Sequence, residues 1–100
     1  MLFSIHCLDG GDRKALRAEN FDAHQAYLKT AGVRLVVAGP LLSDDGETAV
    51  GSMFVVDVED RQAAESFNQG DPFHRAGIWG HIEIHRFNKR WDDRVPPETA

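Results

Sequence analysis

Apolar and polar residues alternate along four stretches of the chain, which is the pattern of strands that bury only one face. The stretches cover residues 2–8, 34–42, 50–58 and 78–87. In the first stretch, Phe3, Ile5 and Cys7 share one face. Asp44-Asp45-Gly46, between the second and third stretches, is typical of a hairpin turn. The alternation predicts four strands, two of them joined as a hairpin.

Between the strands, the apolar spacing changes to that of helices. Over residues 13–30 one stripe is expected to hold Leu16, Ala23, Tyr27 and Ala31, with Phe21, His24 and Leu28 beside it. Gly32 follows at the position of a C-terminal cap. A short helix is expected over residues 60–69, with its inward side formed by Ala63, Ala64 and Phe67.

The expected order is strand, helix, strand, strand, helix, strand, which is the ferredoxin-like βαββαβ arrangement. The predicted fold class is therefore α+β: a four-stranded antiparallel sheet with two helices on one face. The other face of such a sheet has no cover from its own chain.

The last strand indicates the character of that open face. Strict alternation directs Ile78, Ile82 and Ile84 to the helices, and it directs to the open face Trp79, His81, Glu83, His85 and Phe87. An aromatic, partly polar face suits contact with a second subunit, so we expect a homodimer with a pocket between the subunits. The alternative is a monomer whose open face meets water, which antiparallel sheets tolerate.

With 100 residues, 42% of them hydrophobic, the chain is long enough for one domain with a real core. Residues 1–88 are expected to form this domain. Residues 89–100 are charged and proline-containing, and they are expected to form a polar C-terminal tail.

Charge and cysteine content exclude several classes of partner and compartment. A net charge of −5 and a pI near 5.4 argue against binding to nucleic acid or to an acidic membrane surface. The single cysteine, Cys7, excludes an internal disulfide and fits a reducing compartment. The chain has no recognisable signal peptide, and its longest uncharged apolar run, residues 35–42, is too short to span a bilayer. A cytoplasmic location is expected.

The most promising candidates for chemistry are His24 and Asp71. An imidazole whose second nitrogen donates to a carboxylate is fixed in one tautomer and prepared for proton transfer. Asp71 precedes Pro72-Phe73, so the expected turn holds it rigidly. The alternative is that His24 is a boundary residue of an amphipathic helix and that Asp71 only caps a turn.

Other candidates are weaker. His81 and His85, four residues apart on a strand, are separated by roughly 13 Å at ~3.3 Å per residue, too far to share one metal ion. Cys7 lies mid-strand on an apolar face and is expected to be a small buried side chain rather than a nucleophile. Ser52 stands in an apolar strand and is expected to point its hydroxyl into a pocket. Gly10-Gly11 lacks the spacing of a dinucleotide or phosphate loop, so no organic cofactor is expected.

Taken together, these segments resemble the YciI-like (YCII-related) family within the dimeric α+β barrel group. The similarity rests on the order and spacing of Arg17, His24-Gln25-Ala26-Tyr27-Leu28, Ala38-Gly39-Pro40-Leu41, Asp45-Gly46, Gly51-Ser52, Asp71-Pro72-Phe73 and Ala76-Gly77. The resemblance implies a ferredoxin-like subunit, a homodimer and an active-site pair of His24 and Asp71. Among the matching residues, the substrate contacts are expected to come from Arg17, Gly39, Pro40, Ser52 and Phe73.

Two functions remain open at this point. The first is an enzyme of lyase or isomerase type, without metal or organic cofactor, in which His24 is general base or acid and Asp71 orients it. Its reaction would be proton abstraction, elimination or isomerisation on a small cyclic or aromatic molecule. The alternative is a non-catalytic ligand-binding or accessory dimeric module, favoured by the aromatic residues expected on the open face.

Overall fold

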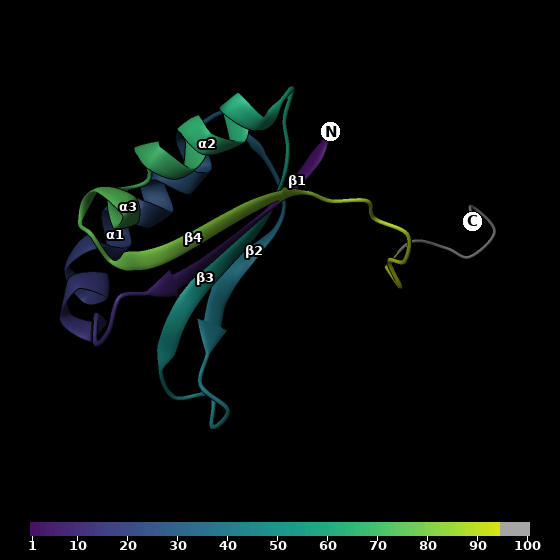
Figure 1. Ribbon diagram of the computed structural model, residues 1–100. Coiled ribbons are helices and arrows are strands. Elements are labelled where there is room, and N and C mark those ends of the chain that lie inside the picture. Colours follow the sequence, from purple (N-terminus) through teal and green to yellow (C-terminus); the bar gives the residue numbers. More distant parts are fainter. Residues whose placement is uncertain (95–100) are drawn as a thin grey trace.

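The computed structural model describes residues 1–94 and confirms the predicted α+β arrangement (Figure 1). Along the chain the elements are β1 (Leu2–Asp9), α1 (Lys14–Thr30), β2 (Arg34–Leu42), β3 (Ala49–Asp57), α2 (Arg61–Gly70), α3 (Pro72–Arg75) and β4 (Trp79–Arg86). The sequence predicted all of them within two residues except the short helix α3.

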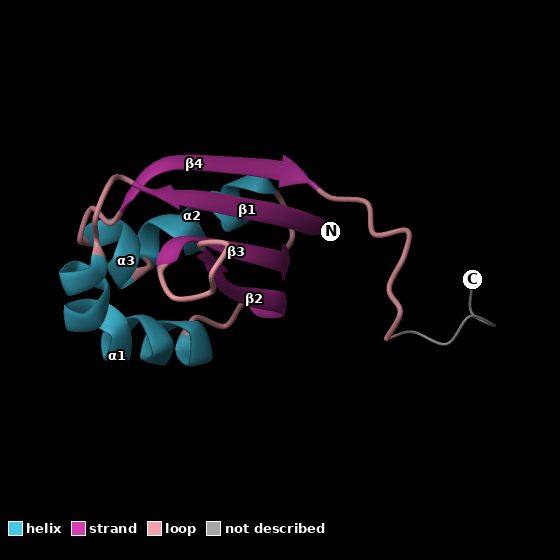
Figure 2. Cartoon of the chain, turned by 90° about the horizontal axis from the view of Figure 1, so that it is seen from below, coloured by secondary structure: helices cyan, strands magenta, loops and turns pink. Residues whose placement is uncertain are grey.

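The four strands form one antiparallel sheet in the order β2-β3-β1-β4. The helices lie together on one side of it (Figure 2). Helix α2 packs over β1 and β4, whereas α1 packs mainly against α3. Helix α1 consequently stands away from β2 and β3, and this separation makes room for a cavity.

The core lies between the sheet and the helices, as the alternation predicted. Phe3, Ile5 and Cys7 of β1 are at most 2% exposed and belong to the same apolar cluster as Phe54 and Phe67. Removing this apolar surface from water is the main driving force for folding. The cluster continues into α3 and the start of β4, so the core reaches the segment around residue 71.

Two expectations for the stripe on α1 are wrong. Ala23 is exposed, and Phe21 is 52% exposed. The only buried residue of the helix is His24, and Leu16 and Tyr27 are partly buried before and after it in the helix. Because α1 leans toward α3 instead of lying flat on the sheet, its buried stripe is rotated toward His24.

The sequence predicted a bare turn after α2, but this segment is the start of helix α3. The Asp71 carboxylate accepts a hydrogen bond of 2.9 Å from the backbone N–H of Phe73 and so caps this helix. Pro72 occupies the first helical position, where a missing N–H is harmless. The cap and the proline together fix the direction of the Asp71 side chain.

Trp79 lies on the helix side of the sheet, so its predicted place on the open face is wrong. Strand β4 pairs Leu8 with His81 but Asp9 with Trp79, and this shift in register is a bulge. The bulge rotates Trp79 inward, where it is 8% exposed and its ring meets Phe54 and Phe73 edge to face. Strict alternation cannot reveal a bulge, because the extra residue leaves no mark on the apolar pattern.

The other predicted residues of the open face are in place. His81 and Glu83 are exposed, and the ring of His81 lies 2.7 Å from the Glu83 carboxylate. This hydrogen bond lowers the pKa of Glu83. Apolar side chains on the same face are also exposed, among them Leu8 and Met53, each 39%, and Phe87, 42%.

Residues 87–94 carry no helix or strand and run away from the sheet (Figure 1), and Trp91 is 93% exposed. The predicted tail covers residues 89–100, of which 95–100 lie outside the described residues, so the domain boundary stays a prediction. No helix within residues 1–94 has the length and hydropathy needed to cross a membrane.

The buried thiol yields a prediction about pH. Burial raises the pKa of Cys7 from 9.0 to about 12, and the Asp71 charge adds to this effect while a hydrogen bond from Asn68 opposes it. At pH 9 the native protein should hold roughly 500-fold less thiolate than the unfolded chain and react correspondingly more slowly with iodoacetamide. Mass spectrometry of timed reactions with and without denaturant measures this difference.

The raised pKa of Cys7 also makes the stability of the protein depend on pH. Because the native thiol keeps its proton above pH 9 and the unfolded thiol loses it, the free energy of unfolding should fall between pH 9 and 12. The slope contributed by Cys7 is at most about 1.4 kcal/mol per pH unit, and Cys7→Ala should lack it. Equal slopes in urea titrations of the two proteins would contradict this assignment.

Candidate functional site

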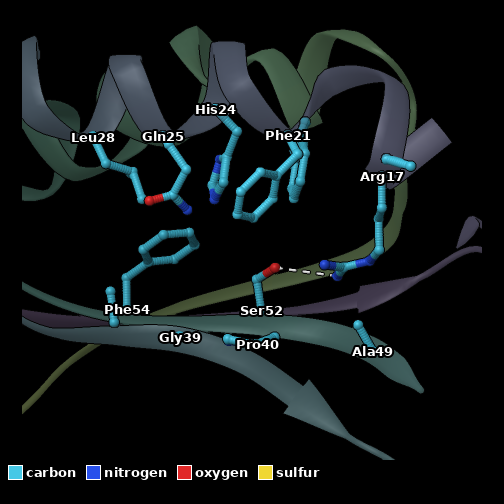
Figure 3. Close-up of a pocket in the computed structure, with 13 residues that line it drawn as sticks. Arg17, Phe21, His24, Gln25, Leu28, Gly39, Pro40, Ala49, Ser52 and Phe54 are labelled. Carbon is cyan, nitrogen blue, oxygen red and sulfur yellow. Dashed lines mark hydrogen bonds between the residues drawn. The ribbon is translucent and has the colours of Figure 1, made fainter. Parts of the chain in front are cut away.

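A cavity of about 430 Å³ lies between α1 and the strands β2 and β3. Figure 3 shows α1 as one wall and the two strands as the opposite wall. Its lining consists of Arg17, Ala18, Phe21, His24, Gln25, Leu28, Ala38, Gly39, Pro40, Ala49, Ser52, Phe54 and Phe73. A volume of this size suits a small organic molecule.

The structure brings the sequence-predicted site residues to this one place. Those that line the cavity are Arg17, His24, Gly39, Pro40, Ser52 and Phe73, and Asp71 lies directly behind His24. The prediction missed the apolar and amide side chains of the lining, among them Phe21, Gln25 and Phe54. Phe21 precedes His24 by three positions and Leu28 follows it by four, so both share its side of the helix, and this spacing was the available signal.

His24 and Asp71 form a buried pair. The His24 Nδ1 atom lies 2.7 Å from the Asp71 Oδ1 atom, and the two residues are 7% and 1% exposed. Toward an ionised carboxylate Nδ1 must donate, because a carboxylate only accepts. The proton of a neutral His24 therefore sits on Nδ1, and its Nε2 carries a free lone pair.

Only one of the two carboxylate oxygens of Asp71 accepts hydrogen bonds from residues 1–94. Its Oδ1 atom accepts from both His24 and the Phe73 N–H, whereas Oδ2 is buried without a hydrogen-bond partner among residues 1–94. A buried anion with an unpaired oxygen is costly, and a cation beside it offsets that cost. Asp71 is therefore well suited to stabilise a positive charge on His24.

Aromatic contacts fix the plane of the His24 ring. The ring stacks on Phe73 with a centroid distance of 3.9 Å and an interplanar angle of 6°. Phe54 meets it edge to face, with centroids 6.4 Å apart. The imidazole is thus held by Asp71 in its own plane and by Phe73 on one face, so it cannot easily rotate away from the cavity.

Arg17 is held by several hydrogen bonds at the end of the cavity away from Leu28 (Figure 3). Its Nε and Nη2 atoms donate to the two oxygens of Asp9, at 2.7 and 2.8 Å, and Nη2 also lies 2.8 Å from the Gly51 carbonyl. The guanidinium carbon lies 5.3 Å above the Phe73 ring, a cation–π distance. Within residues 1–94, no hydrogen bond from the Arg17 Nη1 atom is found, and Arg17 lines the cavity.

Ser52 joins Arg17 to the core. Its Oγ atom lies 3.2 Å from Arg17 Nη2 and 3.2 Å from Trp79 Nε1 (Figure 3 shows the first of these contacts). Ser52 is 4% exposed although it borders the cavity. The bulge that turned Trp79 inward therefore also supplies a hydrogen bond to the cavity wall.

Other chemistries find less support in the described part of the chain. Cys7 is fully buried, and its raised pKa keeps it a thiol. No group of three His, Cys, Asp or Glu side chains within residues 1–94 is arranged to hold a metal ion. The side chains that line the cavity are able to exchange a proton and to form hydrogen bonds.

Comparisons with known proteins agree with this fold. The family model described as YCII-related domain matches residues 1–88. Two relatives called Protein YciI, from Escherichia coli O6:H1 and Shigella flexneri, are each 29% identical over 96 residues, spanning 89% of this chain and 98% of the relative.

Two solved structures are similar to the chain. The first is 5-chloro-2-hydroxyhydroquinone dehydrochlorinase from Burkholderia phenoliruptrix AC1100 in complex with 2,5-dihydroxybenzoquinone; it has a TM-score of 0.80 and 30% identity, over 88% of this chain and 94% of that one. The second is an ethyl tert-butyl ether D (EthD) family protein from Bacillus halodurans C-125, with a TM-score of 0.51 and 16% identity over 88% and 99%. At that identity the second likeness concerns the fold alone.

The Arg17–Asp9 pair yields a stability prediction. Asp9→Asn should lower the free energy of unfolding by about 3 kcal/mol or more, because it leaves a largely buried guanidinium without its counter-charge. The side chains of Arg17 and Asp9 are 12% and 4% exposed. Urea denaturation followed by circular dichroism measures the change.

Asp57→Asn is the control, since it removes a carboxylate from exposed ion pairs with Arg34 and with the N-terminal amine of Met1. The Asp57 side chain is 36% exposed, that of Arg34 77% and that of Met1 42%. We expect a loss below about 1 kcal/mol there. Equal losses in the two variants would show that the Arg17 pair is no better shielded from water than a surface pair.

Proposed function

Because the chain belongs to the YCII-related family, we propose that it is a small-molecule enzyme whose cavity performs general acid–base chemistry. The reaction class is proton abstraction leading to elimination or isomerisation of a small cyclic or aromatic compound. The observation that carries the proposal is the buried hydrogen bond of 2.7 Å between His24 and Asp71 beside a cavity of about 430 Å³. That no metal or organic cofactor takes part stays a prediction.

In this proposal His24 is the catalytic base and Asp71 its positioning residue. With Nδ1 donating to Asp71, the Nε2 lone pair of a neutral imidazole is available to a substrate proton. When Nε2 takes that proton, the imidazolium gains a nearby carboxylate whose second oxygen lacks a partner within residues 1–94. Charge stabilisation by Asp71 would then lower the barrier to proton removal.

The solved relative suggests elimination as the reaction within this class. It is a dehydrochlorinase of a chlorinated hydroxyhydroquinone, and it is 30% identical to this chain. On a hydroxylated aromatic ring, a proton first moves from an O–H group to the carbon that carries the leaving group, which gives the keto tautomer. A base then takes a second O–H proton, the electron pair moves through the ring, and the leaving group departs from that carbon as an anion. An acid–base pair beside a cavity suits this step and needs no covalent intermediate.

The remaining cavity residues are proposed as the substrate-binding walls. Phe73 is a candidate for contact with a planar ring, and Gly39 and Pro40 form an apolar wall on β2. Arg17 brings positive charge to the end of the cavity away from Leu28 (Figure 3). The net lining is apolar with a few polar groups, which is the usual character of a site for small organic molecules.

We also propose that a second copy of the chain covers the open sheet face. Leu8, Met53 and Phe87 are each between 39% and 42% exposed there, beside the polar group of His81 and Glu83. Exposed apolar side chains on one face of a sheet are typical of a surface that associates. The homodimer and a cytoplasmic location are the assembly and compartment that go with the proposed function.

The alternative function is a non-catalytic ligand-binding or accessory dimeric module. The exposed imidazole and aromatic groups of the open face favoured it, but the inward position of Trp79 removes one of these aromatic residues from that face. Binding of 2,5-dihydroxybenzoquinone without turnover of any chlorinated hydroxyhydroquinone would support this alternative.

The catalytic assignment predicts the effect of two substitutions. With 5-chloro-2-hydroxyhydroquinone as first test substrate, His24→Gln should reduce chloride release by about 10²–10⁴-fold, because the base is lost. Asp71→Asn should reduce it as well, because an amide cannot balance the imidazolium charge. Chloride assays at saturating substrate measure both effects.

His74→Gln is the control, because His74 lies outside the cavity lining. It should retain turnover close to that of the unaltered protein. Undiminished chloride release by a correctly folded His24→Gln protein would exclude His24 as the base.

The dimer has its own prediction. Met53→Glu should shift the sedimenting species from twice 11.1 kDa to 11.1 kDa, because it places a charge at the centre of the proposed contact. Ala26→Glu, an equal charge on an exposed position of α1, should leave the dimer intact. Sedimentation velocity of all three proteins decides the question, and a monomeric unaltered protein would exclude the proposal.

A further inference from the structure

Ser52 borders the cavity with an oxygen that two donors already contact. Arg17 Nη2 and Trp79 Nε1 each lie 3.2 Å from the Ser52 Oγ atom. Guanidinium and indole N–H groups donate hydrogen bonds and cannot accept them. Both contacts therefore use lone pairs of the Ser52 oxygen and leave its hydrogen free. The contact from Arg17 is the longest of three that Nη2 makes, so Ser52 shares an Nη2 hydrogen with Asp9 or the Gly51 carbonyl.

A serine hydroxyl has two lone pairs and one hydrogen, so the two contacts fill its accepting capacity. Within residues 1–94, no hydrogen bond donated by Ser52 to another residue is found, and the side chain lines the cavity. We infer that Ser52 is a hydrogen-bond donor fixed toward the cavity, and that the substrate presents an acceptor oxygen to it. This inference rests on the proposed function of the same cavity.

The cavity then has a defined polarity. On the α1 wall, His24 offers the Nε2 lone pair, because its Nδ1 atom is engaged by Asp71. On the β3 wall, Ser52 offers a hydrogen (Figure 3 shows the two side chains on opposite walls). A matching ligand has an acidic O–H or C–H on one side and a carbonyl, enolate or phenolate oxygen on the other. The substrate class is thus a small conjugated ring with oxygen substituents.

This polarity serves the proposed proton transfer. When the substrate proton moves to His24 Nε2, the electron pair left behind is delocalised through the conjugated ring onto the oxygen beside Ser52. The Ser52 hydrogen bond stabilises the charge that develops there. Because its oxygen accepts from a guanidinium, the Ser52 O–H is polarised and donates more strongly.

Two ring compounds of nearly equal shape test the direction of this hydrogen bond. Pentafluorophenol, used at pH 8 as the phenolate, presents one strong acceptor oxygen. Pentafluorotoluene replaces that oxygen by a methyl group. Titrations followed by ¹⁹F NMR give a dissociation constant for each, and their ratio is the preference for the acceptor oxygen. Neither compound needs to react, so the preference is measured independently of turnover.

Ser52→Ala should weaken phenolate binding by about tenfold or more, as expected for a hydrogen bond to a charged group. Pentafluorotoluene binding should change less than about twofold, since no hydrogen bond is lost there. Ser52→Cys, with similar volume and only a weak S–H donor, should behave the same way and replaces Ser52→Ala if that protein does not fold. Ser66→Ala, the same substitution at an exposed position of α2 outside the cavity lining, is the control and should keep the preference.

The outcomes separate this inference from the proposed function. An unchanged preference in both Ser52 variants would overturn the donor role, and so would an equal weakening of both ligands, which indicates a structural role only. The preference should persist in His24→Gln, where catalysis is removed. If the unaltered protein shows the preference but turns over no chlorinated hydroxyhydroquinone, the result would support the donor role of Ser52 and count against the proposed enzymatic function.

Discussion

The cavity depends on one buried carboxylate. Asp71 is 1% exposed, and only two donors reach it within residues 1–94: the Phe73 N–H and the His24 imidazole. An anion at this depth is tolerated only where the fold supplies such partners. Because His24 must reach Asp71, α1 lies against α3. The side of α1 that carries His24 is buried there, and α1 does not lie flat on the sheet. The space left between α1 and β3 is the cavity.

The rest of the site follows from keeping every other polar group in this region paired. Arg17 would be costly near the core without Asp9, and Trp79 would leave a buried N–H unpaired without Ser52. Each of these pairs uses part of a side chain and leaves another part facing the cavity. The proposed base is the Nε2 atom of His24, whose Nδ1 atom is engaged by Asp71. The proposed donor is the hydroxyl hydrogen of Ser52, whose oxygen is engaged by Arg17 and Trp79. This explains how a chain of 100 residues can hold a polar site so close to its core.

Local patterns anticipated much of the site, and their failures have physical causes. His24 and Asp71 are 47 positions apart, and only the resemblance to a family indicated that they meet. Asp71 before Pro72 indicated a rigid bend, but the bend proved to be a helix cap. Trp79 was misplaced because a bulge between Leu8 and Asp9 interrupts the two-residue period. Ala23 was misplaced because the rotation of a helix about its axis depends on what it packs against.

The sequence by itself determined the elements, their order and the buried face of the first strand, because strand and helix periods are local properties of the chain. It also supplied the residue types of the site. Tertiary structure alone decided the direction of each hydrogen bond: that Asp71 faces the Nδ1 side of His24, and that Ser52 receives two donors. Such directions depend on the relative positions of side chains from different elements, which packing and a one-residue bulge set and no periodic pattern records.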